Sequence, residues 1–239
     1  MREIILFIIM IPVYLFSQGS VDSRYELSVA SGIGSYAMLN LKDLQNTAMK
    51  NNPLALIKTT SFPAYYNYSF RYGTKNGNKY EGITGGLMST GARSSLADYS
   101  GYYTSDIDCM AFHAGYYNRT KLMNYQLFNQ ALEIGYLFNG SFIYSSVTMT
   151  DNLQLYGIDE AIVYDSYTFN SVGVYTEPML YATYMFCKYI GIEFNAGGAL
   201  SISSPLYYES IKNVVSIYDK NRFSSWTGYR LSIGIISRF

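Results

Sequence analysis

Five ionisable residues occupy positions from which they could share one enclosed space: Arg71, Glu133, Glu177, Glu193 and Arg230. Each lies on the polar side of a segment in which polar and apolar residues alternate, so a sheet that closed on itself would gather all five in its interior. Isolated charges there would be costly, and mutual pairing offsets the desolvation. We interpret them as a lumen charge network that fills the interior with salt bridges. The alternative is a gate or an ion path.

The other reactive side chains form no recognisable site. His113 is the single histidine, flanked by Phe112 and Ala114 with no serine nearby, so a Ser-His catalytic system is not indicated and a pairing role in the lumen is expected. Cys109 and Cys187 should lie at opposite ends of the strands and remain unpaired. One histidine and two distant cysteines supply no metal-ligand spacing. We expect no enzyme, no catalytic residue, no cofactor and no metal.

The elements that must position these residues are strands, because the dominant period from Tyr25 onward is two. Long connectors are expected near 37–61, 92–105, 150–166 and 202–222, and short turns near 75–78, 119–125 and 187–188. Long loops on one side and tight turns on the other give an up-and-down meander. Eight segments are predicted: 24–36, 62–74, 79–91, 106–118, 126–149, 167–186, 189–201 and 223–239. Pro178 interrupts the sixth and suggests a bulge there.

The two faces of each segment differ in composition, and this difference indicates whether the outside of the barrel contacts water or lipid. One face is apolar, and the other is rich in Gly, with a few ionisable residues and little Lys. A soluble barrel would turn the apolar face inward, whereas a transmembrane barrel turns it toward lipid. Aromatic residues near segment ends and lengths of 12 or more residues favour the membrane barrel. A secreted lipocalin-like barrel is the structural alternative.

Composition excludes several classes of protein. Lys and Arg number 17 against 17 Asp and Glu, so the basic excess that is typical of nucleic-acid binding is absent. Charged residues make up 14% of the chain and hydrophobic residues 49%, which argues against intrinsic disorder. Aromatic residues reach 17%, among them 27 Tyr. A charge-poor, tyrosine-rich chain fits a protein that is not surrounded by water on all sides.

The N-terminus predicts export. An apolar run from Ile4 to Phe16 follows Arg2 and precedes Ser17, too short for a bilayer span and typical of a signal peptide. We predict cleavage after Ser17, so that 1–17 is a signal peptide and 18–239 is the barrel domain. No later run reaches 18 uninterrupted apolar residues.

These features together resemble the small eight-stranded outer-membrane β-barrels of the OmpA/OmpX type. In those families a terminal Phe with apolar residues at alternate preceding positions is read by the barrel-assembly machinery. Leu231, Ile233, Ile235 and Phe239 match this assembly signal, while Ser237 departs from it. The resemblance implies an all-β, eight-stranded antiparallel transmembrane barrel in the bacterial outer membrane, with lipid and the assembly machinery as partners.

The remaining functional prediction concerns the long loops. Asn40 is a plausible N-cap for a short amphipathic helix that ends before Pro53, in the first long loop. We expect a structural or surface-interaction protein with a side-chain-filled lumen and an extracellular partner bound through its long loops. The alternatives are a narrow porin-like channel, a carrier for small apolar molecules and, less favoured, a membrane-embedded hydrolase.

Overall fold

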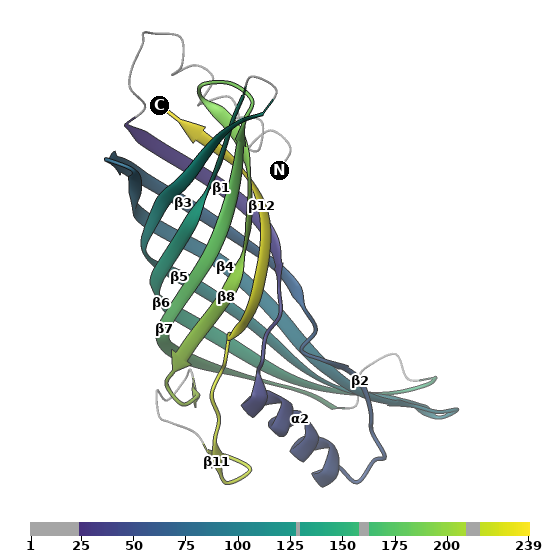
Figure 1. Ribbon diagram of the computed structural model, residues 1–239. Coiled ribbons are helices and arrows are strands. Elements are labelled where there is room, and N and C mark those ends of the chain that lie inside the picture. The colour runs from purple at the N-terminus through teal and green to yellow at the C-terminus, as the bar shows by residue number, and fades with distance from the viewer. Residues whose placement is uncertain (1–23, 128–129, 158–162, 209–215) are drawn as a thin grey trace.

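The computed structural model describes residues 24–127, 130–157, 163–208 and 216–239. The predicted signal peptide, 1–17, lies outside them. Eight long antiparallel strands build the molecule (Figure 1). They are β1 (Tyr25–Gly34), β3 (Tyr65–Asn76), β4 (Lys79–Ala97), β5 (Gly101–Leu127), β6 (Gln130–Leu155), β7 (Val163–Met185), β8 (Ile190–Ser203) and β12 (Gly228–Arg238).

The eight strands form a closed ring. Each pairs with its neighbours along the chain, and the last strand, β12, pairs with the first, β1, through a register that runs from Glu26↔Arg238 to Gly34↔Arg230. Every pairing in the ring is antiparallel. The predicted fold, an eight-stranded up-and-down β-barrel, is therefore confirmed.

The apolar face of the barrel points outward. Val29, Ile83, Phe142, Leu180 and Ile233 are all about half exposed or more, at 54%, 57%, 78%, 65% and 49%. Their neighbours along each strand point into the interior and are mostly small or polar. An even-numbered closed barrel with an apolar exterior and a polar interior is the architecture of bacterial outer-membrane proteins. We accordingly place the chain in that membrane, and the lipocalin-like alternative is excluded.

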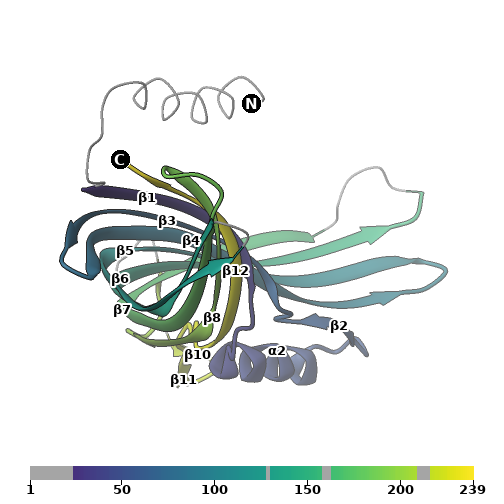
Figure 2. The same ribbon diagram turned by 45° about the horizontal axis from the view of Figure 1, so that its top comes forward.

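Four strands continue past the rim of the barrel. Pairing of β3 with β4 stops at Met88, and pairing of β8 with β7 begins only at Gly173. Between these limits β4, β5, β6 and β7 stay paired, as far as Ala97↔Tyr102 at the β4–β5 end. We call this projecting sheet, residues 92–97, 101–108, 148–155 and 163–170, the wall. Figure 2 shows it extending to the right, away from the barrel.

The outer face of the wall has the composition of a surface in water. Below it, the outward residues on β5 are Phe112 and Met110, which are exposed and apolar. Along the wall the outward positions become hydroxyl-rich, and Thr148 and Thr168 Oγ1 atoms lie 3.3 Å apart on neighbouring strands. The apolar band ends at this change, so the wall stands outside the lipid. The outward hydroxyl residues are Ser95, Thr104, Thr148, Thr150, Ser166 and Thr168.

The structure corrects three predicted connectors, two of which belong to the wall. Residues 92–105 and 150–166 were expected to be long loops and 119–125 a short turn, yet most of the described residues in all three are strand. Outside the membrane both faces of a strand can carry Ser, Thr and Tyr, so the apolar alternation that marks a strand disappears although the backbone ladder continues. The β4–β5 connection is a tight turn, in which Asp98 Oδ1 accepts from the backbone N–H of Ser100 (2.8 Å).

The first loop contains the predicted helix, α2 (Leu39–Asn51). Its N-cap is Met38, in the left-handed conformation at φ 44°, and not Asn40 as predicted. Leu41 and Leu44 face inward and are fully buried. The loops also contain β2 (Ile57–Ser61), which pairs with β4, and β9 (Tyr207–Tyr208), which pairs with β7. β10 (Ser216–Ile217) and β11 (Lys220–Asn221) pair with each other.

Two smaller features complete the fold. The β7–β8 register is the same on both sides of Pro178, so the bulge predicted there is absent; the ladder only skips Glu177 and Pro178. A real register shift occurs between Lys121 and Met123 of β5. Among the described residues, no helix has the length and apolar character needed to cross a membrane.

Candidate functional site

The half of the lumen nearer the C-terminus of β12 holds one contiguous set of ion pairs. Arg119 lies at its centre: Nη1 is 2.5 Å from Glu26 Oε2, and Nη2 is 3.2 Å from Glu193 Oε2. Arg71 also pairs with Glu193. We call the whole set the lumen network; it contains three arginines and three glutamates, so its formal charge is zero. Its members are Glu26, Arg71, Arg119, Glu133, Glu193 and Arg238, all buried.

Arg238, at the end of β12, closes the lumen network. Its Nη1 and Nη2 atoms donate to the two oxygens of Glu133 at 2.8 and 2.6 Å, a bidentate pair. Its Nε donates to Glu26 at 3.1 Å. The guanidinium carbon of Arg119 also lies 3.9 Å from the centre of the Tyr181 ring, which closes one side of the network.

A second polar layer lies nearer the wall and α2. Arg230 Nε is 3.9 Å from Glu177 Oε1, so this pair is looser than those of the lumen network. Arg230 mainly binds backbone oxygens, donating to Ser35 O at 2.7 Å and to Trp226 O at 2.9 Å. Glu177 accepts from Asn139 Nδ2 at 2.8 Å. The structure thus places all five predicted lumen charges inside the barrel, divided between two layers.

An apolar layer covers the lumen above Arg230. Trp226, with none of its surface exposed, packs edge-on against Tyr36, with ring centres 5.0 Å apart, and its indole N–H donates to Ser145 Oγ at 2.8 Å. Residues of α2 and the loops complete the layer, which we call the cap. Its larger members are Tyr36, Met38, Leu41, Leu44, Phe62, Phe169, Leu206 and Trp226. The lumen network, the looser Arg230–Glu177 pair and the cap follow one another along the interior.

Sequence reasoning missed three members of the lumen network. Glu26 and Arg238 lie at the two chain ends of the ring, and Arg119 was assigned to a turn because β5 was expected to stop at Asn118. Extending the two-residue alternation from Tyr117 would have placed Arg119 on the inward face. Glu26 could have been found in the same way, as an ionisable residue on the polar face of the first segment.

The histidine has a neighbour that was not expected, whereas the cysteines are unpaired as predicted. His113 Nδ1 lies 3.4 Å from Ser141 Oγ on the adjacent strand, so a serine does accompany it, contrary to the prediction. His113 is 3% exposed, and its ring centre lies 4.8 Å from that of Tyr175. Both cysteines are free; Cys109 is buried and Cys187 is exposed. Among the described residues no group of three or more His, Cys, Asp or Glu side chains could hold a metal.

The residues of the predicted assembly signal lie on β12 and at its end. Leu231, Ile233 and Ile235 point outward and are exposed. Phe239 is half-buried, with its ring centre 5.8 Å from that of Tyr25, and its backbone pairs with Tyr25. The signal therefore occupies the outer face of the strand that closes the ring.

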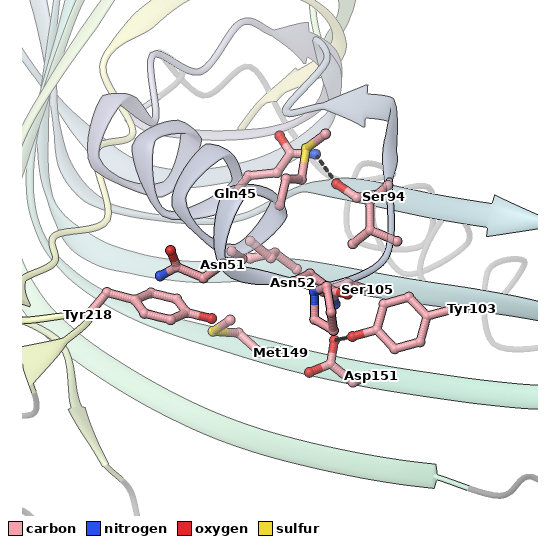
Figure 3. Close-up of a pocket in the computed structure, with 14 residues that line it drawn as sticks. Gln45, Asn51, Asn52, Ser94, Tyr103, Ser105, Met149, Asp151 and Tyr218 are labelled. Atoms are coloured by element: carbon pink, nitrogen blue, oxygen red, sulfur yellow. Dashed lines mark hydrogen bonds between the residues drawn. The ribbon is translucent and has the colours of Figure 1, made fainter.

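A pocket lies between α2 and the inner face of the wall (Figure 3). Its volume is about 200 Å³. Gln45 joins the two elements: its Nε2 donates to Ser94 Oγ at 3.1 Å and to Thr60 O at 2.8 Å. In Figure 3, Tyr103 and Tyr218 lie at opposite ends of the pocket, and Asp151 lies along its wall side.

Burial and a carboxylate perturb one phenol in the pocket. Tyr103 OH donates to Asp151 Oδ1 at 2.9 Å. Partial burial, together with this carboxylate, raises the pKa of Tyr103 to about 12. The phenol therefore stays protonated at physiological pH and remains a hydrogen-bond donor.

A salt bridge attaches α2 to the fourth loop. Asp43 Oδ2 on the helix lies 2.5 Å from Arg222 Nη1 and 3.5 Å from Lys220 Nζ. The hydrogen bond from Arg222 holds the pKa of Asp43 below its usual range. Arg222 also donates to Asn40 O at 3.2 Å, so one buried arginine contacts the first turn of the helix twice.

Comparisons with known proteins give only a distant likeness. No family model matches the chain, and no curated protein matches it. Two crystal structures of Ail, the attachment invasion locus protein of Yersinia pestis, align with 92% of this chain and all of theirs. One is a complex with the heparin analogue sucrose octasulfate (8% identity, TM-score 0.39), and the other has 9% identity and a TM-score of 0.31. At these values nothing about function or site residues passes from Ail to this chain.

Proposed function

We propose that this protein is a bacterial outer-membrane surface barrel that binds an extracellular partner through its wall and loops, and that its lumen is filled and does not conduct. The observation that carries the proposal is the wall. Four strands remain paired well beyond the apolar band, and the outer face changes there from apolar to hydroxyl-rich residues. A barrel that only occupied the bilayer would need short connections at this level.

A filled lumen is supported by the packing of its charges. Three arginines and three glutamates neutralise one another in the lumen network, and the cap covers them. An eight-stranded barrel has an interior just wide enough for side chains to fill. A porin-like channel or a carrier for small apolar molecules would need space that these side chains occupy. A catalytic role for His113 would need access that its burial denies.

Two further partners belong to the proposal. Outer-membrane lipid contacts the apolar band, and the barrel-assembly machinery reads Leu231, Ile233, Ile235 and Phe239 during biogenesis. The outward position of three of these residues on the ring-closing strand supports such a role. The proposal also sets the orientation: the β4–β5 turn faces the medium, while the chain ends and the β7–β8 turn face the periplasm.

Thiol labelling of intact cells tests this orientation with a built-in control. Ser100→Cys places a thiol in the exposed β4–β5 turn, while the native Cys187 lies exposed in the β7–β8 turn at the opposite end. A membrane-impermeant maleimide should label S100C on intact cells and leave the wild-type protein unlabelled. After the outer membrane is permeabilised, Cys187 should react in both. Labelling of the wild type on intact cells, or none of S100C, would overturn the proposal.

A further inference from the structure

We propose that the pocket between α2 and the wall binds one uncharged sugar residue, a hexose or N-acetylhexosamine unit. This inference rests on the proposed surface role and names its ligand class. The pocket opens on the side of the molecule that we assign to the medium, and its volume of about 200 Å³ is close to that of one hexose. At about 30 Å³ per molecule, the same space would hold only six or seven waters.

The polar groups around the pocket suit hydroxyls. Three carboxamides and four hydroxyls border it, and each of these groups can both donate and accept a hydrogen bond. A sugar hydroxyl also does both, so such a lining can bind several adjacent hydroxyls at once. The carboxamides belong to Gln45, Asn51 and Asn52, and the hydroxyls to Ser94, Ser105, Tyr103 and Tyr218.

One of these groups has an unused acceptor. Gln45 is 3% exposed, and its Nε2 is committed to three acceptors of β2 and β4. Its Oε1 is buried and has no donor among the described residues. This oxygen exposes almost no surface, so a ligand in the pocket would bind the other carboxamides and hydroxyls, while Gln45 fixes α2 against the wall.

The rest of the lining is apolar, which suits the C–H faces of a pyranose. Met49 and Pro53 come from the end of α2, and Ile107 and Met149 from the wall. The rings of Tyr103 and Tyr218 stand at the two ends of the pocket (Figure 3). Apolar and aromatic surfaces next to hydroxyl-binding groups favour an amphipathic ligand over a hydrated ion.

The charge of the pocket selects against acidic ligands. Asp151 is its one ionised group, and no Lys or Arg is among the described residues that line it. On the wall, Asp151 is the cross-strand partner of Asp165, so a second carboxylate is nearby. Sulfated or carboxylated sugars would meet repulsion. A simple ammonium ligand is also disfavoured, because the Asp151 carboxylate already accepts from Tyr103.

Saturation-transfer NMR on the full chain in nanodiscs tests the proposal with D-glucose, D-galactose, D-mannose and N-acetyl-D-glucosamine as probes. We expect saturation transfer to at least one of them, and no displacement by a heparin oligosaccharide. Asp151→Asn and Tyr103→Phe alter the pocket without touching the Gln45 contacts and should each weaken binding at least fivefold. Asp108→Asn, an exposed carboxylate on the outer face, is the matched control and should bind as the wild type does.

Three results would overturn the inference: no transfer to any of the four sugars, equal binding by D151N, Y103F and the wild type, or displacement by heparin. If D151N did not fold, it would lose heat-modifiable gel migration. The test would then use Y103F alone. Surface labelling of S100C is independent of these outcomes. A protein that is labelled at the surface but binds no sugar would lose this inference and keep the proposed function.

Discussion

Arg119 and Glu26 lie 93 positions apart in the chain, and their side chains meet at 2.5 Å inside the barrel. The contact exists only because the ring closes, since β5 is on the far side of the sheet path from β1. Both side chains are almost fully buried. Each charge therefore depends on the other to offset its transfer out of water.

Removing Arg119 should leave three buried carboxylates short of a partner. We predict that Arg119→Met lowers the free energy of unfolding by about 3–5 kcal/mol, as expected when one member of a buried ion pair is lost. Urea titration of the protein in lipid vesicles measures the change. The control is Arg93→Met, because Arg93 pairs with Asp106 on the wall with a 56% exposed side chain. That pair should contribute at most about 1 kcal/mol; equal effects of the two substitutions would contradict the account.

The Asp43–Arg222 salt bridge predicts acid-dependent loosening of α2. Arg222 lowers the pKa of Asp43 in the folded state. The bridge therefore stabilises the helix fully at pH values above the usual Asp pKa of about 4. This stabilisation is lost as the pH falls through the lowered pKa. Trp226, the single tryptophan, packs in the cap with Leu41 and reports on it. Acrylamide should quench its fluorescence little between pH 8 and pH 5, and more strongly in stronger acid.

Asp43→Asn should produce that stronger quenching already at neutral pH. Asp219→Asn, on the same loop, is the matched control and should behave as the wild type does. Unchanged quenching in D43N would show that the salt bridge does not hold the helix on the barrel.

The titration of the Tyr103 phenol reports directly on its surroundings in the pocket. Burial and Asp151 raise its pKa to about 12. In protein labelled with ¹³C at the tyrosine Cζ, with Tyr103→Phe used for assignment, its resonance should titrate later than those of exposed tyrosines. In Asp151→Asn the pKa should fall but stay above 10, because burial, the larger cause, remains. An unshifted titration in D151N would show that the Asp151 contact does not form.

The sequence was sufficient to predict the barrel but not the wall. Inside the bilayer, lipid on one side and the lumen on the other force a strict alternation, which is why β3 and β12 were located within a few residues. Beyond the bilayer water contacts both faces, the alternation disappears, and the end of β6 from Thr150 to Leu155 resembles a loop in sequence. Pairing there is specified by the neighbouring strands, which no single segment reveals.

The candidate sites also differ in whether the sequence alone could identify them. Arg71, Glu193 and Arg230 could be identified because they interrupt apolar alternation within the membrane. The pocket could not be identified, because Gln45 and Asp151 come from a helix and a strand 106 positions apart whose meeting depends on the wall. Its residue types, Asn, Gln, Ser and Tyr, are also those of ordinary loops.

Conductance in planar bilayers tests the central claim most directly. Purified protein, shown to be folded by heat-modifiable migration, should insert and give no steady open level, because the lumen network, the Arg230 layer and the cap fill the interior. A steady, reproducible open level from the wild-type protein would contradict the filled lumen and favour the porin-like alternative.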